Sequence, residues 1–549
     1  MPPRNNYAFY FSSKNRRRRC LLFLCEASMS LIYRALFYAF AVILSFFSST
    51  AVVAGQLILK NTSLSPITCT VDGWTVSSGS SFDWFIKVQP GQSFFVGQNT
   101  SRPKDPVINW AKCNNLQTRA MTITPSGPNQ TLVLNGQQTQ VLNVSLYPFL
   151  PTLPTDNFEN LVAYIVQTYQ SQHPQVLLNA VLNPQVNIYS FTELPVLLGN
   201  DGFDVIELDV LYLGFLADNH LINPAQITGE APWAVALAGA TYQGQLWAIP
   251  SWLCMDFFYA FDQAIQQQKT LSKMLNYLNT RTSSVAKMAG SFNGSWAIPS
   301  DYINAYVQTY GYGALQQAMQ MPPDNGVVHQ LVSLSDTCSF NGVNKCTNNT
   351  YHNAPNGGAE QVFASGQAST DMGFSEQSFY VNLYSSAQKP LYVVPTPWGE
   401  HPQPLLFEDA FVSSAATCKP GSQCAANAQA FTTLMTGTAM KNYIVQSKDL
   451  PAGTPWRTLL VATQQFWQQS IIANNSYYQQ LSPIFMTAKA FPNNFTPQSQ
   501  VAMANGICNA LKQQQPNFVC KSNNSTSLLA PSHGSSIINP RSTDSRRGL

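Results

Sequence analysis

The residue that the sequence leaves unaccounted for, and that could do chemistry, is Cys254. The chain has 11 cysteines, two of which, Cys20 and Cys25, lie near the amino terminus. Eight of the remaining nine are sequence neighbours, which can form short-range disulfides in an oxidising compartment. The pairs are Cys69 with Cys113, Cys338 with Cys346, Cys418 with Cys424, and Cys508 with Cys520. Cys254 has no such neighbour, so it is a buried inert thiol, half of an intermolecular bridge, or a nucleophile.

Three acidic residues lie in surroundings that suit chemistry. Asp209 follows the apolar strand expected at 203–208, and open α/β sheets bind ligands at such strand ends. Glu376 follows a Gly/Ser-rich stretch, and Asp409 lies in a mostly apolar run. Carboxylates in such places can transfer protons or hold a polar ligand. Taken singly, each is more often a helix cap or a solvated loop carboxylate. Tyr147, at the end of another expected strand, is by default an interface aromatic.

Several familiar catalytic motifs are absent from the sequence. It contains no H-E-x-x-H or C-x-x-C metal motif, no phosphate-binding P-loop and no G-x-G-x-x-G. The segment 373–377 lacks the closing glycine of a nucleophile elbow, and the six histidines show no metal-ligand spacing. A zinc enzyme and a serine hydrolase are therefore disfavoured, and we expect neither a metal nor an organic cofactor.

The first 54 residues have the order of a signal peptide. A basic run at 16–19 precedes the strongly apolar stretch 31–47, and small residues follow as far as Ala54. The same pattern fits a signal anchor that stays in the membrane. No later stretch is apolar enough to span a bilayer. We therefore expect the remaining chain to be secreted, or to stay in the lumen of the secretory pathway.

Composition and charge agree with export. Only 10% of the residues are charged, against about 25% in a typical domain. The first 54 residues hold seven basic side chains and one acidic one, so without them the formal net charge changes from +3 to −3. No basic face for nucleic acid is therefore expected. Ten N-x-S/T sequons, Asn143 and Asn474 among them, predict a glycoprotein.

The residue patterns divide the chain into four parts. A leader at 1–54 precedes a small β-rich domain at 55–141, an α/β domain at 142–521 and a disordered tail at 522–549. Turn signals such as Asp72-Gly73 separate the short strands of the β-rich domain, which predicts a small β-sandwich. These strands are expected at 56–60, 82–88, 93–97, 122–124 and 131–134. The domain carries no recognisable chemistry.

The second domain alternates strands and helices, which predicts an α/β fold. Its first strands are expected at 144–149, 176–181 and 203–208. Asp156, with Glu159 three residues later, predicts the start of a helix. The apolar face of this helix consists of Phe158, Leu161, Val162, Ile165 and Tyr169.

Residues 142 to about 515, some two-thirds of the chain, resemble thiaminase I (thiamine pyridinylase) in the order and spacing of five segments. The most specific is Gly244-Gln245-Leu246-Trp247-Ala248-Ile249-Pro250-Ser251-Trp252-Leu253-Cys254, which is similar to the nucleophile segment of that family. The other four are Tyr147-Pro148-Phe149-Leu150-Pro151, the strand at 204–209, Phe374-Ser375-Glu376 and Phe407-Glu408-Asp409. The family usually has tyrosine where this chain has Phe374 and Phe407.

The resemblance implies a two-lobed α/β fold like that of periplasmic solute-binding proteins, here preceded by the small β-sandwich-like domain. It implies a secreted transferase that displaces the thiazole of thiamine by a base or thiol. Cys254 would form a covalent adduct with the pyrimidine, because a thiolate is a soft nucleophile, and Glu376 would act as its base. No cofactor is implied, and thiamine and the acceptor are the expected partners of a monomer.

The same resemblance gives roles to the residues around the nucleophile. Asp209 and Asp409 would accept hydrogen bonds from the amino group and ring nitrogen of the aminopyrimidine. Tyr147, Trp247 and Trp252 could stack on the heterocycle.

Two other kinds of protein remain open. A secreted, non-catalytic binder of thiamine or another small molecule would keep the acids and aromatic residues and consume nothing, because a two-lobed fold does not fix function. An adhesive or structural protein would use the β-rich domain as its functional part.

Overall fold

The structure is a computed structural model, in which all described residues belong to one compact unit that starts at Ala54. The described residues are 55–75, 81–96, 106–119, 129–183, 186–281, 284–292, 297–351, 358–386 and 389–520. The expected leader, the strand expected at 122–124 and the expected tail lie outside them. No helix among the described residues is both long and apolar enough to cross a membrane.

The β-rich part consists of two sheets that share one apolar core. The first has the strand order β4-β1-β7, and the second β3-β2-β5-β6. Their bounds are β1 Leu57–Asn61, β2 Ile67–Thr75, β3 Ser81–Val88, β4 Ser93–Val96, β5 Pro106–Cys113, β6 Leu116–Gln117 and β7 Gln130–Leu134. Alternate residues point into the core, for example Leu57 and Leu59 from one sheet and Cys69 and Val71 from the other.

Three of these strands, β2, β5 and β6, were not predicted. Asp72-Gly73 was expected to form a turn, and this was wrong: the two residues lie within β2, where the register against β5 shifts. A bulge of this kind keeps the strand paired while it bends. The ring of Phe82 covers Gly73 so closely that a Cβ there would lie 2.5 Å from the ring.

A larger sheet follows, with the strand order β21-β13-β20-β10-β8-β9 and β22 beside β20. Its strands are β8 Gln140–Ser145, β9 Val176–Val181, β10 Val205–Asp209, β13 Ile249–Cys254, β20 Leu405–Ser413, β21 Leu460–Val461 and β22 Lys489–Ala490. The prediction for 176–181 is confirmed. The strand expected at 144–149 lies earlier, because Leu146 to Phe149 leave the sheet, and the predicted boundary at residue 141 falls within β8.

The helix predicted near Asp156 exists but begins differently. Helix α2 spans Glu159–Gln172, and its N-cap is Phe158, whose backbone is left-handed with φ 61°. The Asp156 carboxylate instead accepts hydrogen bonds from the hydroxyl of Thr152 and the amide of Phe158. The predicted helix start at Asp156 was wrong, because this carboxylate closes a turn before the helix. The predicted apolar face is buried, as expected.

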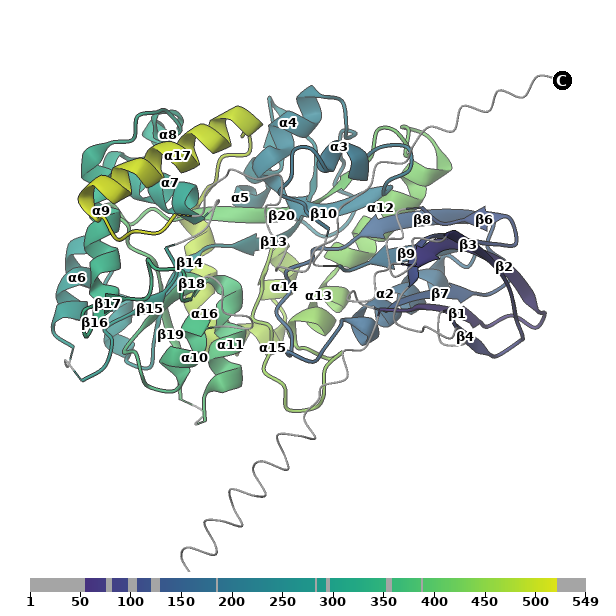
Figure 1. The fold of residues 1–549 in the computed structure, drawn as a ribbon, viewed down its shortest axis with the longest axis horizontal. Coiled ribbons are helices and arrows are strands. Elements are labelled where there is room, and N and C mark those ends of the chain that lie inside the picture. The colour runs from purple at the N-terminus through teal and green to yellow at the C-terminus, as the bar shows by residue number, and fades with distance from the viewer. Residues whose placement is uncertain are drawn as a thin grey trace, which may run out of the picture. The chain divides into compact units, whose positions relative to one another are not determined.

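The second lobe is built on a four-stranded sheet of order β15-β18-β14-β19 (Figure 1). Its strands are β14 Asp256–Ala260, β15 Ala289–Gly290, β18 Asp371–Phe374 and β19 Tyr392–Pro395. Helices α7 (Ala297–Tyr310), α9 (Asn325–Ser335) and α17 (Pro497–Gln514) contact one another beside this sheet. The two sheets and their helices confirm the predicted two-lobed α/β fold.

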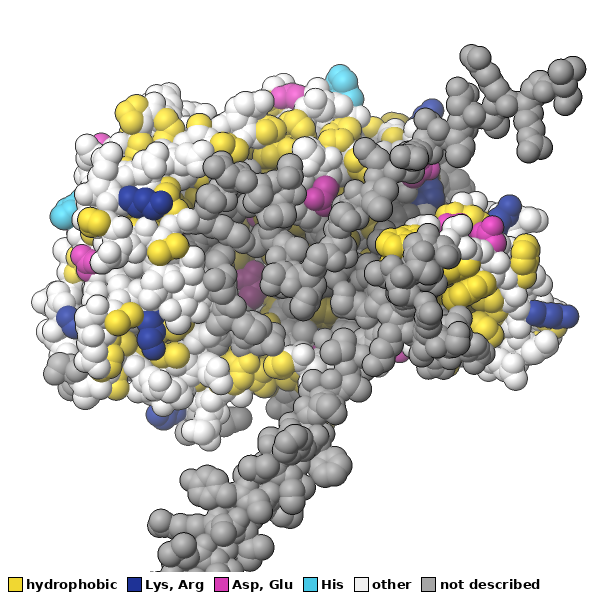
Figure 2. Space-filling model, in the orientation of Figure 1, with side chains coloured by type: hydrophobic (Ala, Val, Ile, Leu, Met, Phe, Trp, Pro, Cys, Tyr) yellow, Lys and Arg dark blue, Asp and Glu magenta, His cyan; other side chains and the backbone are white. Residues whose placement is uncertain are grey.

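All four predicted disulfides are present, and Cys254 is a free, buried cysteine. One predicted glycosylation site cannot be modified in the folded chain, because Asn143 is 0% exposed on β8. On the face drawn in Figure 2, the Lys and Arg side chains of the described residues stand apart and form no continuous basic patch.

Candidate active site

Cys254 lies where the chain crosses from one lobe to the other. It is the last residue of β13 in the larger sheet, and Asp256 is the first residue of β14 in the four-stranded sheet. Only Met255 lies between them, and its carbonyl oxygen accepts a 3.0 Å hydrogen bond from the amide of Ser375. This bond holds the end of β18, and therefore Glu376, next to the segment that connects β13 to β14.

The thiol and the carboxylate contact each other directly. Cys254 Sγ donates to Glu376 Oε2 at 3.1 Å, and the Ser375 hydroxyl donates to the same oxygen at 3.0 Å. Burial raises the pKa of the Cys254 thiol, and the charge of Glu376 raises it further. Burial also raises the pKa of Glu376, which the bond from the thiol partly offsets. The pKa shift of Cys254 therefore favours the thiol over the thiolate.

Two further acids face each other across neighbouring strands. Asp209 on β10 is directly opposite Asp409 on β20 in an antiparallel register, so both side chains lie on one face of the sheet. Burial raises the pKa of Asp209 to about 7, although it accepts hydrogen bonds from the amide of Leu211 and the hydroxyl of Tyr189. Burial and the charge of Asp209 raise the pKa of Asp409 well above its usual range. Close to neutral pH, such a pair holds a proton readily.

Tyr147 lies between the acids and the thiol. It follows the end of β8, where its amide donates to Glu207 Oε2 at 2.9 Å. Burial raises the pKa of its phenol, and the charges of Asp409 and Glu376 add to the effect because both lie close to the ring. Tyr147 as a whole is buried, at 7% exposure.

Trp252 lies on β13 opposite Asp409, but one face of its ring is already occupied. The Lys441 ammonium lies 3.3 Å from the ring centroid. Trp247 lies farther from the nucleophile on the same segment, half-buried, and its indole N–H donates to the carbonyl of Tyr242 at 3.3 Å. No contact of Trp247 with Cys254, Glu376 or the two aspartates is found among the described residues.

Phe374 and Phe407 form an apolar wall beside the thiol. Phe407 is opposite Cys254 in the register of β13 and β20. Its ring centroid lies 6.0 Å from that of Phe374 and 4.5 Å from that of Phe491. This wall offers no phenolic proton donor, so Glu376 is the titratable group that touches the thiol.

Two residues of the site were missed from the sequence. Tyr189 donates to Asp209 Oδ2 at 3.4 Å, and it lies in a segment without motif or regular structure. Asp256 follows the nucleophile by two residues, and burial together with the charge of Glu376 raises its pKa to about 7. The position of Asp256 next to the nucleophile segment could have indicated it, whereas nothing in the sequence marks Tyr189.

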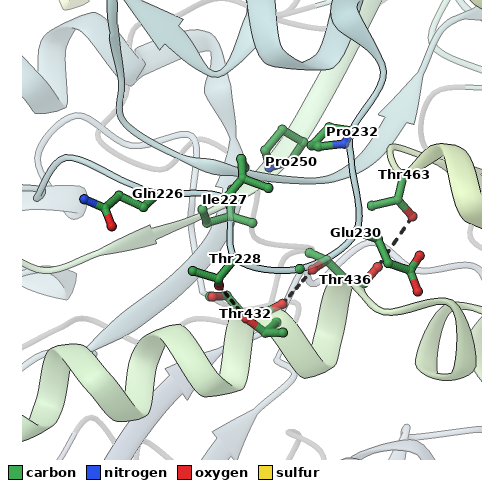
Figure 3. Close-up of a pocket in the computed structure, with 12 residues that line it drawn as sticks. Gln226, Ile227, Thr228, Glu230, Pro232, Pro250, Thr432, Thr436 and Thr463 are labelled. Carbon is green, nitrogen blue, oxygen red and sulfur yellow. Dashed lines mark hydrogen bonds between the residues drawn. The ribbon is translucent and has the colours of Figure 1, made fainter.

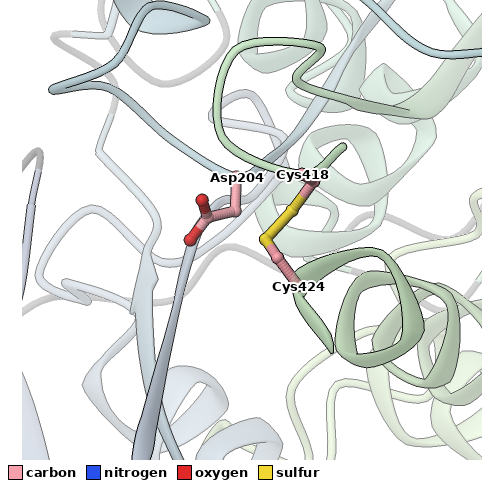
Figure 4. Close-up of side chains that lie close together, drawn as sticks. All are labelled: Asp204, Cys418 and Cys424. Atoms are coloured by element: carbon pink, nitrogen blue, oxygen red, sulfur yellow. A yellow bond between two sulfur atoms is a disulfide. The ribbon is translucent and has the colours of Figure 1, made fainter. Parts of the chain in front are cut away.

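Two other features of the described residues lie outside this site. A pocket lined by Thr228, Thr432, Thr436 and Glu230 is located at the start of β13, at the other end of that strand from Cys254 (Figure 3). Asp204 lies beside Cys418 and Cys424 (Figure 4). The two sulfurs form a disulfide, so they are not available as metal ligands.

The fold is that of the two-lobed solute-binding proteins. An ABC transporter solute-binding protein from Thermotoga lettingae, bound with α-D-tagatose, matches with a TM-score of 0.51 at 13% identity. The match covers 69% of this chain and 96% of that protein. No protein-family model and no curated protein matches the sequence.

Thiaminase I structures have the same fold. Thiaminase I from Bacillus thiaminolyticus matches with a TM-score of 0.54 at 18% identity, over 68% of this chain and 99% of that one. Clostridium botulinum thiaminase I in complex with thiamin matches with a TM-score of 0.51 at 14% identity, over 67% of this chain and 99% of that one. At these identities the similarity establishes the shared fold.

Proposed function

We propose that the protein is a secreted thiamine-degrading transferase that exchanges the thiazole of thiamine for an amine or thiol. The observation that carries this proposal is the 3.1 Å contact between Cys254 Sγ and Glu376 Oε2 at the crossing between the lobes. A nucleophile and a base within hydrogen-bond reach are what covalent catalysis requires. The fold shared with thiaminase I supports the choice of substrate.

The substrate itself completes the activation of the thiol. Thiamine carries a permanently charged thiazolium ring, and a cation beside a buried acid favours the ionised form of that acid. Burial and Glu376 raise the pKa of the Cys254 thiol. The thiazolium charge therefore lowers this pKa when thiamine binds. Glu376 takes the thiol proton, and the thiolate forms only with substrate present.

The remaining steps balance without a metal or an oxidant. The Cys254 thiolate adds to the aminopyrimidine ring, and the bond from the methylene carbon to the thiazolium nitrogen breaks. The thiazole leaves as a neutral molecule with that electron pair. An amine or thiol then adds to the methylene carbon and loses a proton to solvent, and Cys254 departs and recovers its own proton from Glu376.

The facing aspartates suit the aminopyrimidine ring. One of them, protonated close to neutral pH, donates its proton to a ring nitrogen, and the other accepts a hydrogen bond from the exocyclic amino group. A protonated ring is poorer in electrons and is attacked more readily by a thiolate. Tyr147 and Tyr189 then close the site around this end of the substrate.

Base exchange tests the proposal directly. The purified protein, incubated with thiamine and aniline, is expected to consume thiamine and to form the pyrimidine–aniline product. Cys254→Ser is expected to abolish this turnover while the variant remains folded and exported. Intact-mass measurement with a thiamine analogue that traps the adduct should add one pyrimidine to Cys254. Undiminished turnover by Cys254→Ser would show the proposal to be wrong.

A second candidate is a non-catalytic binder of thiamine or a related small molecule. The match to a tagatose-bound solute-binding protein, whose TM-score equals that of the thiamin complex, favours this alternative. Calorimetry with thiamine in the presence of aniline separates the two. Reversible binding without any exchange product would establish the binder.

A further inference from the structure

A lysine is buried next to the proposed site, in contact with Ser251 and Trp252. Lys441 lies on helix α13 (Thr438–Val445), and its side chain is 0% exposed. Its ammonium donates to Ser251 Oγ at 2.7 Å and lies 3.3 Å from the centroid of the Trp252 ring. A buried ammonium is expensive unless its charge and its protons are matched, so its partners identify its role.

The partners form a hydrogen-bonded chain that leads to the site. The Ser251 hydroxyl accepts from Lys441 and donates to Glu207 Oε1. The other carboxylate oxygen of Glu207 accepts from the amide of Tyr147 at 2.9 Å. Ser251 is 0% and Glu207 2% exposed, so bulk water does not compete for the hydrogen bonds between these residues.

The hydrogen-bonded series of Lys441, Ser251 and Glu207 lies next to the facing aspartates on the same face of the sheet. Glu207 precedes Asp209 by two residues on β10, and alternate residues of a strand share a face. Trp252, which Lys441 covers, is opposite Asp409. The charged groups that act on the ammonium are Glu207 and Asp409, and both raise its pKa, whereas burial lowers it to about 7. The cation and these two carboxylates therefore stabilise one another.

We propose that Lys441 is a positioning residue of the site, which through Ser251 and Glu207 fixes the main chain at Tyr147 and favours negative charge on Asp409. It touches neither the nucleophile nor the base. Its removal leaves Glu207 as a buried carboxylate without its cation, loosens the Tyr147 amide and makes the ionised form of Asp409 less stable. This role rests on the proposed transferase function.

The test compares Lys441→Met with Lys448→Met, which removes an exposed lysine just beyond the same helix. We expect Lys441→Met to raise the KM for thiamine about tenfold, with a smaller fall in kcat. Loss of the cation raises the pKa of Asp409, so the acid limb of kcat/KM should move to higher pH. Lys448→Met should behave as the unmodified protein does.

A second variant covers a failure of Lys441→Met to fold. Ser251→Ala keeps both charges and interrupts the chain, and we expect a rise in KM of three-fold or more with the same direction of pH shift. Thermal melting of each variant verifies that the protein is folded. If the unmodified protein exchanges thiamine and the folded variants match Lys448→Met in KM and pH profile, the positioning role is wrong. Absence of exchange by the unmodified protein would instead overturn the proposed function.

Discussion

The amide of Ser375 donates to the carbonyl of Met255 at 3.0 Å, and this backbone bond extends the pairing of β14 and β18 to the two segments of the proposed site. Met255 follows the nucleophile directly, and Ser375 precedes Glu376 directly. The bond therefore sets the separation of thiol and carboxylate through rigid main chain rather than through flexible side chains. Sites held in this way are pre-organised for reaction.

Glu376→Gln should leave Cys254 in place and remove its base. The glutamine amide cannot take the thiol proton, so we expect kcat for base exchange to fall roughly 10²–10⁴-fold. The KM for thiamine should change little, because in the proposed function the facing aspartates, and not Glu376, bind the pyrimidine. Glu400→Gln, at an exposed carboxylate that binds Ser272, is the matched control and should keep full activity. Steady-state kinetics of both variants measures this difference. An equal fall in kcat for Glu400→Gln would contradict the role of Glu376 as the base.

The pH dependence of the reaction follows from the same carboxylate. Burial raises the pKa of Glu376, so it becomes protonated, and is lost as a base, at a higher pH than an exposed glutamate would. We therefore expect the acid limb of kcat/KM to lie above the pKa of an exposed glutamate. A profile of kcat/KM from pH 4 to 9, which reports the enzyme without substrate, measures this limb. A limb at the pKa of an exposed glutamate, about 4.3, would contradict the raised value.

Much of the fold could be predicted from residue patterns because the patterns record burial. The strand at 176–181 is apolar apart from Asn179, and all six of its residues are buried. Pairing of sequence neighbours predicted the four disulfides found among the described residues. Three of them close short loops, whereas Cys69 and Cys113 face each other on the paired strands β2 and β5. The Asp72-Gly73 turn and the helix start at Asp156 failed because the same local residues can close a turn or a bulge, and only the neighbouring strands decide.

The supporting parts of the site were harder to predict. Tyr189 reaches Asp209 from an irregular segment, so no period or motif marks it. Lys441 is about 190 residues from Ser251 in the sequence, and a lysine in a helix is ordinarily exposed. Such residues become functional only through contacts between distant segments, which no local pattern contains.

Asp209→Asn should change how stability depends on pH. The unfolded carboxyl titrates near 3.9, whereas burial raises the folded pKa to about 7, so the folded chain binds the extra proton between these values. The contribution to stability is full below about pH 4 and is lost as the pH rises through 7. The neutral amide of the variant does not titrate and avoids this loss. As the pH rises from 4 to 8, the free energy of unfolding of the variant should therefore increase by on the order of 3 kcal/mol relative to that of the unmodified protein.

Urea unfolding at pH 5 and at pH 8 measures this difference. Asp83→Asn, which alters an exposed aspartate on β3, is the control and should follow the unmodified protein at both values. Equal differences between Asp209→Asn and the unmodified protein at the two pH values would mean that Asp209 is not a titrating buried acid.

The sequon at Asn143 should be unoccupied in the folded protein. Its side-chain oxygen accepts from the amides of Arg119 and Asn179, at 2.8 and 2.9 Å, and its NH₂ group donates to Asp204 at 3.0 Å. A glycan would break all three bonds. Glycopeptide mass spectrometry is expected to find Asn143 unmodified.

Asn143→Leu leaves buried donors without partners and should lower the free energy of unfolding by about 2–4 kcal/mol. Asn474→Gln, at an exposed sequon, should cost less than about 0.5 kcal/mol. A glycan on Asn143, or equal stability of the two variants, would contradict the buried network.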